Sequence, residues 1–163
     1  MSESHSNQQV VAEPDRRADE EDRARGLLRE AIGCRTSDPD QARQLVLDAR
    51  VIARAAGLAL VEADAIYQLA ALAHQAGRTD EAFGLAVEVV ESAGPDDCTL
   101  TVAWSLHLIA VVYYQTNNHT GALEHALRAL QVYRATDHFV DEGRILHTVA
   151  AVYQAMGDHD RAT

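Results

Sequence analysis

Lysine is absent from this sequence, and all 14 of its basic residues are arginine. The absence excludes the lysine that holds phosphates in a P-loop, and it also excludes Schiff-base chemistry and the attachment of pyridoxal phosphate. Large classes of nucleotide-dependent and carbonyl-transforming enzymes are therefore removed from the candidate functions.

Basic charge, cysteine and long apolar runs are all scarce. The 14 arginines face 25 acidic residues, and the formal net charge of -11 repels nucleic acids and anionic membranes. Cys34 and Cys98 show no CxxC spacing, which suits free thiols in a reducing compartment. No run approaches the roughly 18 apolar residues of a membrane span, and the polar start resembles neither a signal peptide nor an anchor. We expect a cytoplasmic protein that binds neither nucleic acid nor membrane.

The chain divides into a polar start and a helical remainder. Residues 1–19 are rich in Ser, Asn, Gln and charge, which predicts a disordered N-terminal tail. Residues 20–163 have the apolar content of one folded domain. At its beginning, Ala24, Leu27, Leu28 and Ala31 fall on one helical face, which predicts a helix over 23–33 that covers the N-terminal end of the domain.

Alanine recurs every 40 residues, at Ala42, Ala82, Ala122 and Ala162. The same step is kept by Ala70, Ala110 and Ala150, by Leu69, Ile109 and Val149, by Ile66, Leu106 and Leu146, and by Gly77, Asn117 and Gly157. A fixed period of this length is typical of stacked supersecondary units. Within each unit the apolar residues follow the i, i+3, i+4, i+7 spacing of a helix, and sustained strand-like alternation is missing. The sequence therefore predicts an all-α protein with two helices in each unit.

Helix starts and ends are marked by local signals. Asp38 before Pro39 predicts an N-cap, as do Thr79 before two acidic residues and Asp137 before the last long helix. The column of Gly77, Asn117 and Gly157 supplies residues that tolerate the left-handed conformation in which helices end.

Two segments carry a family resemblance, "LIAVVYYQTNNHTGA" at 108–122 and "TVAAVYQAMGDHDRA" at 148–162. They resemble the tetratricopeptide repeat in its 40-residue bacterial variety. The resemblance implies a right-handed superhelical solenoid of helical hairpins with about seven helices. Tyr113 and Tyr153 fill the family's aromatic column, but Ala73 replaces it in the earlier copy. Ala86 and Ala126 likewise stand where the family's second helix usually has an aromatic residue.

The printed sequence stops at Ala162 and Thr163, where another second helix is due. We therefore expect an array that is truncated at its C-terminal end and forms the N-terminal regulatory module of a larger bacterial signalling protein. By resemblance, the missing effector is a diguanylate or other nucleotide cyclase, a kinase or a transcription regulator.

Eight histidines raise the question of metal or acid–base chemistry. His107 and His147 share a column, but no Cys, Asp or Glu shares it to complete a four-ligand zinc site. Neither HExxH nor GxSxG occurs. We expect no metal site, no cofactor and no catalytic residue, and hence no enzyme.

The candidate functional feature is a surface. On each first helix a second stripe lies about 100° around the axis from the core stripe, and the resemblance implies that this stripe lines a concave groove where a protein or peptide partner docks. The predicted groove residues are Asp64, Tyr67, His74, Trp104, His107, Tyr114, Arg144, His147 and Gln154. An equally weighted alternative is that Trp104 and Tyr114 only pack against neighbouring helices or against the missing C-terminal repeats.

Three functions remain open. The first is a non-catalytic interaction and regulatory module. The second is a groove that binds a small molecule or a signalling peptide and shifts the curvature of the solenoid. The third is self-association, since an unfinished array exposes an apolar end that a homodimer would bury.

Overall fold

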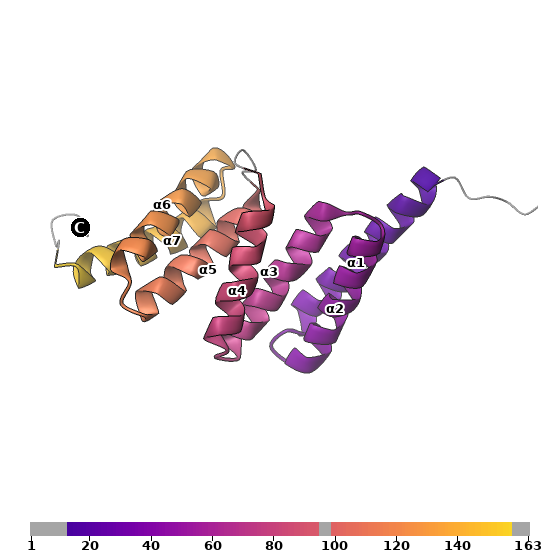
Figure 1. Cartoon of the computed structure of the whole chain (residues 1–163), viewed down its shortest axis with the longest axis horizontal. Coiled ribbons are helices and arrows are strands. Elements are labelled where there is room, and N and C mark those ends of the chain that lie inside the picture. The colour runs from indigo at the N-terminus through magenta and orange to yellow at the C-terminus, as the bar shows by residue number, and fades with distance from the viewer. Residues whose placement is uncertain (1–12, 95–98, 158–163) are drawn as a thin grey trace, which may run out of the picture.

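The computed structural model describes residues 13–94 and 99–157, and within these ranges it consists of helices joined by short connections, without strands. In chain order the helices are α1 (Glu13–Cys34), α2 (Pro39–Ala55), α3 (Ala59–Gln75), α4 (Thr79–Ser92), α5 (Leu100–Gln115), α6 (His119–Ala135) and α7 (Phe139–Ala155) (Figure 1). The predicted all-α class is confirmed, and so is the expectation of about seven helices.

The first helix begins earlier than the sequence predicted. We expected a disordered tail as far as residue 19 and a helix over 23–33, whereas α1 starts at Glu13. The extension is exposed over residues 15–19, so core packing does not hold it. Pro14 lies in its first turn, where a missing N–H costs nothing, and arginine and alanine follow as good helix formers. The tail expected over residues 1–12 lies outside the described part of the chain.

The turns explain why glycine and asparagine recur in one column. Gly77, Asn117 and Gly157 have φ of 74°, 62° and 77°, the left-handed conformation that few residues other than glycine and asparagine adopt. At the first of these turns the Gly77 N–H reaches the carbonyl of His74, and the next N–H reaches that of Ala73. This pairing satisfies carbonyls at the end of α3 and reverses the chain within a few residues.

One of the three predicted caps is confirmed. The Asp38 side chain accepts a hydrogen bond from the Gln41 N–H, 3.0 Å away, and Pro39 opens α2. The other two caps were wrong, because Thr79 is already the first residue of α4 and Asp137 takes a left-handed φ of 56°. The tight turns place Arg78 and His138 at those cap positions, and their side chains make no capping bond.

The alanine columns are the contact points between helices. Ala42, Ala82 and Ala122 are fully buried on α2, α4 and α6, and Ala70 and Ala110 are fully buried on α3 and α5. Side chains this small let helix axes approach closely. Ala162 lies outside the described residues. The column of Ile66, Leu106 and Leu146 is buried only in its first two copies, since Leu146 on α7 is 40% exposed.

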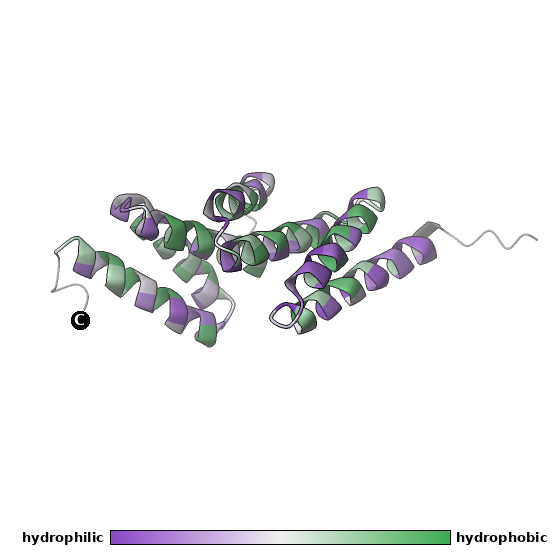
Figure 2. Cartoon of the chain, turned by 90° about the horizontal axis from the view of Figure 1, so that it is seen from below, coloured by the Kyte–Doolittle hydropathy of each residue, from purple (hydrophilic) through white to green (hydrophobic). Residues whose placement is uncertain are grey.

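The seven helices form an arch. Consecutive helices pack against each other, and α1, α3, α5 and α7 also contact one another in succession. Among the described residues, the backbones of α2, α4 and α6 do not approach one another in this way, although ion pairs of long side chains join α2 to α4. Because the helix backbones of the first set lie closer together across repeats, the stack curves towards that set, and α1 and α7 form the two lower arms (Figure 2). We call the side lined by α1, α3, α5 and α7 the inner face.

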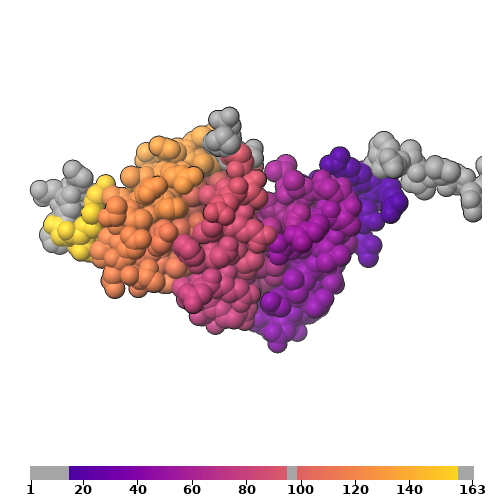
Figure 3. All heavy atoms as spheres, in the orientation of Figure 1, coloured from indigo at the N-terminus to yellow at the C-terminus, as the bar shows by residue number. Residues whose placement is uncertain are grey.

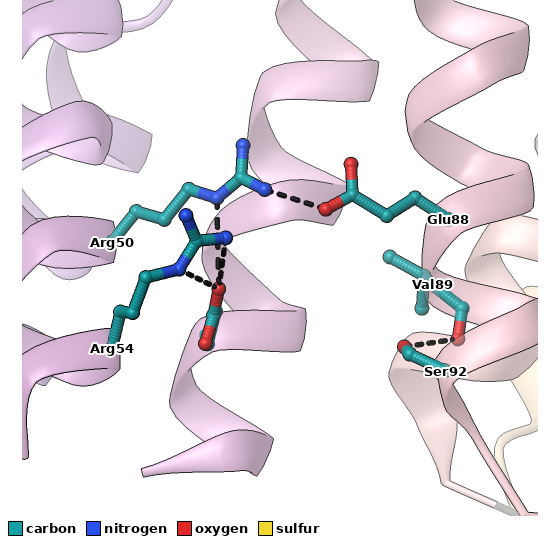
Figure 4. A network of polar contacts seen from close by, with 6 residues as sticks. Arg50, Arg54, Glu88, Val89 and Ser92 are labelled. Atoms are coloured by element: carbon teal, nitrogen blue, oxygen red, sulfur yellow. Dashed lines mark hydrogen bonds and ion pairs between the residues drawn. The ribbon is translucent and has the colours of Figure 1, made fainter. Parts of the chain in front are cut away.

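Ion pairs reinforce the stack between helices. Arg50 and Arg54 of α2 both reach Glu62 of α3, and Arg50 also pairs with Glu88 of α4 (Figure 4). Three helices are thus joined by one network of two cations and two anions. Exposed pairs are each worth only about 0–1 kcal/mol, so the stack is held mainly by its apolar contacts. Side chains fill the spaces between consecutive helices and make the array one continuous body (Figure 3).

Candidate binding face

Polar contacts join neighbouring helices along the inner face. Thr101 of α5 donates its hydroxyl to the Asp64 carboxylate of α3. Trp104 of α5 donates its indole N–H to the Asp141 carboxylate of α7, 2.9 Å away. Both contacts span 37 residues. Given the 40-residue period, Asp64 and Trp104 are equivalent positions, as are Thr101 and Asp141. The same hydrogen bond between neighbouring first helices, which we call a joint, is therefore made twice, with donor and acceptor exchanged.

Two aromatic rings stack at the centre of the inner face. Tyr67 of α3 and Trp104 of α5 have ring centroids 5.5 Å apart and an interplanar angle of 27°. The His138 ring meets the Trp104 ring edge-on at 6.4 Å. Both stacked rings are partly buried, and burial raises the pKa of the Tyr67 phenol, which stays neutral at pH 7. The pair offers apolar ring surface with a fixed orientation.

Asp141 fixes that orientation from the first turn of α7. Its carboxylate accepts the indole N–H of Trp104 and lies 3.5 Å from Arg144 and 3.4 Å from the His138 ring nitrogen. The Asp141 side chain is only 14% exposed. A carboxylate with several partners tolerates this burial, because each partner replaces part of its lost hydration.

His107 lies one turn further along α5. Its Nε2 is 3.2 Å from the Thr148 hydroxyl of α7, and its ring meets that of Tyr133 edge-on at 6.5 Å. Burial lowers the pKa of His107 to about 4, and the positive charge of Arg144 adds to the lowering while Asp141 opposes it. The imidazole is therefore neutral at pH 7 and acts as a hydrogen-bonded spacer between α5 and α7.

Tyr133 of α6 lies beneath this cluster. Its side chain is fully buried, and within the described part of the chain its hydroxyl has no hydrogen-bond partner. Desolvation raises the pKa of the Tyr133 phenol, and the negative charge of Asp141 raises it further. The ring contributes to the core, whereas the buried hydroxyl carries an uncompensated desolvation cost.

Two hollows open on the inner face. Tyr67 and Trp104 both border a cavity of about 450 Å³ between α1, α3 and α5. The residues that line it are Asp22, Arg25, Leu28, Arg29, Ile32, Asp64, Tyr67, Gln68 and Trp104. A second hollow of about 490 Å³ lies between α5 and α7, lined by His107, Val140, Gly143, Arg144, His147 and Thr148. We call the first the α1–α3 cavity.

The structure brings six of the nine predicted groove residues into these hollows. Asp64, Tyr67 and Trp104 line the α1–α3 cavity, and His107, Arg144 and His147 line the second hollow. The other three lie outside both: His74 is partly buried, Tyr114 packs against His119 of α6 at 6.0 Å, and Gln154 is exposed near the end of α7. The predicted stripe is therefore split between six residues that line the two hollows and three that do not.

Several residues of the inner face were missed by the sequence reasoning. Asp141, Thr101 and Tyr133 were not singled out, and α1 was assigned a covering role although Arg25 and Arg29 line the cavity. The period of 40 contains part of the signal: stepping from Asp64 to Trp104 also steps from Thr101 to Asp141. Tyr133 has no such signal, because nothing in its sequence neighbourhood indicates that its ring reaches α5.

Across 13–94 and 99–157, no group of three or more His, Cys, Asp or Glu side chains is placed to hold a metal ion. Over the same ranges, no helix combines the length and the apolar character needed to cross a bilayer.

Comparisons with known proteins identify the repeat. Residues 100–163 match the model of the tetratricopeptide repeat family. Among solved structures, BtubC (BKLC) from P. vanneervenii superposes with a TM-score of 0.59 at 16% identity, over 93% of this chain and 70% of that one, which shows a shared fold. No curated protein matches the sequence. The family match supports a tetratricopeptide repeat over residues 100–163, and the helices of the described chain fit a helical repeat solenoid.

Proposed function

We propose that this chain is the non-catalytic regulatory module of a larger cytoplasmic bacterial signalling protein, and that its partner docks on the inner face. Tetratricopeptide repeats imply a protein-interaction module. Partner binding on the inner face then controls an effector domain such as a cyclase, a kinase or a transcription regulator.

The observation that carries the docking site is the Tyr67–Trp104 stack. Large aromatic residues that are only partly buried, in a hollow with a polar rim, are the side chains that dominate binding energy at protein interfaces. Here the stack borders the α1–α3 cavity, and the Asp141 carboxylate holds the indole in place before any partner arrives. A ring already fixed in position loses little entropy on binding.

The chemistry of the inner face supports a non-catalytic role. His107 has a pKa of about 4 and is hydrogen-bonded to Thr148, so its imidazole is a weak base at neutral pH. Arg25 and Thr101 engage the Asp64 carboxylate, and Trp104 engages that of Asp141. The Asp64 and Asp141 carboxylates are thus used to connect helices.

Site-specific photocrosslinking tests the docking site. A photoreactive amino acid replaces Gln68, which lines the α1–α3 cavity, and in a control protein it replaces Gln131, which is exposed on α6. In cells that express the intact protein, we expect one discrete partner to crosslink at position 68 and not at 131. Crosslinking of that partner at position 131 alone would show that docking occurs on the outer side.

The signalling context needs its own test. An antibody against residues of α2 detects the protein at its natural length in cell extract, and mass spectrometry identifies the remainder of the polypeptide. We expect a product much larger than 17.8 kDa that carries an effector domain. A natural product of about that mass would refute the regulatory part of the proposal.

Self-association is a second candidate that α7 favours. Phe139 and Val140 are 73% and 78% exposed, and Leu146 and Met156 are 40% and 48% exposed. Exposed apolar side chains gathered along α7 and at its C-cap are typical of an interface. Sedimentation of the wild type and of a Phe139→Ser, Val140→Ser variant tests this, with Leu60→Ser on α3 as the control because Leu60 is similarly exposed. A dimer through α7 dissociates only in the first variant.

A further inference from the structure

We propose that the α1–α3 cavity receives an amphipathic helix of the partner protein, aligned antiparallel to α1. That helix carries an acidic residue at position i, an apolar residue at i+3 or i+4 and a basic residue at i+7. The apolar side chain enters the cavity, and the two charges pair with Arg29 and Asp22 of α1. This inference rests on the proposed role of the inner face and specifies the chemistry of its ligand.

The floor of the cavity selects an apolar side chain. Leu28 of α1 is 6% exposed, and the Tyr67 and Trp104 rings complete a surface of carbon atoms. Beside them Ile32 is 49% exposed, although it lies on a helix that is otherwise strongly polar. An aliphatic or aromatic side chain that settles here removes the Ile32 side chain and the two rings from water, which is the main favourable term in association.

The rim of the cavity carries four charges, of which two are already engaged. Arg25 lies 2.9 Å from Glu21 and 3.7 Å from Asp64, and Asp64 also accepts the Thr101 hydroxyl. Within the described part of the chain, the side chains of Asp22 and Arg29 make no hydrogen bond and no ion pair. These two exposed side chains are the rim charges left for a ligand.

The spacing of these two charges defines the ligand. Asp22 and Arg29 are seven residues apart, so they lie on nearly the same face of α1 and about 10.5 Å apart along its axis. A ligand helix spans the same distance between its positions i and i+7, and its position i+3 or i+4 lies midway on that face. One helical face therefore presents both charges and the apolar anchor.

The order of the charges sets the direction of the ligand helix. Arg29 lies towards the C-terminal end of α1 and requires the acidic residue of the ligand, whereas Asp22 requires the basic one. In an antiparallel ligand the acid is then near its N-terminus and the base near its C-terminus. An acid near the N-terminus and a base near the C-terminus is also the arrangement that the dipole of the ligand helix favours.

Trp104 is the single tryptophan of the chain, so its fluorescence reports directly on this cavity. Three synthetic alanine-rich helical peptides without tryptophan serve as probes. The matched peptide has Glu at i, Leu at i+4 and Lys at i+7, the reversed peptide has Lys, Leu and Glu, and the third has Glu, Ala and Lys. We expect saturable binding of the matched peptide, roughly fivefold weaker binding of the reversed one because two ion pairs become repulsive, and loss of binding without Leu.

Exchanging the charges on the protein gives the decisive control. Both side chains are exposed, so the double variant Asp22→Arg, Arg29→Asp is expected to keep the fold and the thermal midpoint of the wild type. This variant should prefer the reversed peptide by a similar factor. If its preference is unchanged, or if none of the peptides alters the Trp104 emission, the helical ligand is refuted.

The two proposals fail separately. Equal binding of the matched and reversed peptides, with Leu still required, refutes the charge order but leaves the inner face as the docking surface. If the peptides do not bind while the partner still crosslinks at position 68, the ligand chemistry is wrong and the docking site stands. If the partner crosslinks only at position 131, the docking site itself is wrong.

Discussion

Trp104 of α5 and Asp141 of α7 form the joint on which the inner face depends, with the indole nitrogen 2.9 Å from the carboxylate oxygen. The preceding joint, between Asp64 and Thr101, has the same spacing but the opposite sense of donation. The two repeats thus place this hydrogen bond at equivalent positions, but the residue that accepts it in one repeat is replaced by a donor in the next. The consequence is a tryptophan that is oriented by the next repeat.

Removing the carboxylate should weaken this joint measurably. We expect Asp141→Ala to lower the free energy of unfolding by about 2 kcal/mol, because a partly buried indole N–H loses an ionised acceptor. Asp141→Asn keeps an acceptor oxygen and should lose less than half as much. Urea denaturation followed by circular dichroism measures both. Glu124→Ala, on the exposed side of α6, is the control and should change little. Equal losses for Asp141→Ala and Glu124→Ala would contradict the assignment.

The same substitution should have opposite effects at two glycines of one repeat. Gly77 has φ of 74°, so Gly77→Ala is expected to destabilise by about 1 kcal/mol through backbone strain. Gly84 lies in the middle of α4 with open space where a Cβ would go, and Gly84→Ala should stabilise by roughly 0.5–1 kcal/mol. Urea midpoints of the two variants test the turn geometry. A neutral or stabilising effect of Gly77→Ala would show that Gly77 does not close α3 in the left-handed conformation.

Tyr133→Phe should leave the protein as stable as the wild type or stabilise it by about 1 kcal/mol. The tyrosine ring is fully buried while its hydroxyl has no partner in the described part of the chain, so the variant removes only an uncompensated polar group. Thermal and urea unfolding provide the measurement. A loss of 1 kcal/mol or more would mean that the hydroxyl is hydrogen-bonded, for instance to a buried water.

The buried imidazole of His107 predicts a loss of stability in mild acid. Its pKa in the folded protein is about 4, below the ordinary value of 6.5, so between pH 6.5 and 4 the unfolded chain binds the extra proton. Stability from this group is complete above pH 6.5 and declines as the pH falls to 4, by about 3 kcal/mol in all. The groups that face the ring are Arg144, Asp141, Thr148 and Tyr133.

His107→Gln isolates this contribution, because the amide keeps a polar contact to Thr148 but does not titrate. Urea denaturation of both proteins over that pH range gives the difference in slope. We expect the wild type to lose more stability than His107→Gln as the pH falls. Parallel curves would show that the imidazole is solvated and titrates normally.

Much of the fold could be predicted from the sequence, because most contacts of a helical repeat lie within one repeat or between adjacent repeats. The columns of Ala42, Ala82 and Ala122 and the turn residues Gly77 and Asn117 each express a requirement that one repeat imposes on itself, either close helix contact or a left-handed turn. Such requirements recur at a fixed period and can be read without knowing the structure. The positions of the helices follow from them within a few residues.

The contacts of the inner face were harder to predict from the sequence, because they join residues of different repeats whose separation differs from the repeat period. The Trp104–Asp141 and Asp64–Thr101 joints each span 37 residues, whereas the visible period is 40. The start of α1 at Glu13 was missed for another reason: an exposed extension that is held by propensity and not by burial lacks an apolar pattern.

The indole N–H of Trp104 offers the most direct test of the inner face as the docking surface. The chain contains one tryptophan, so a ¹H–¹⁵N correlation spectrum contains one indole cross-peak. When the captured partner is titrated into the labelled protein, we predict that this cross-peak shifts or broadens in step with binding measured by calorimetry. An indole cross-peak that stays in place while calorimetry records saturable binding would contradict docking on the inner face.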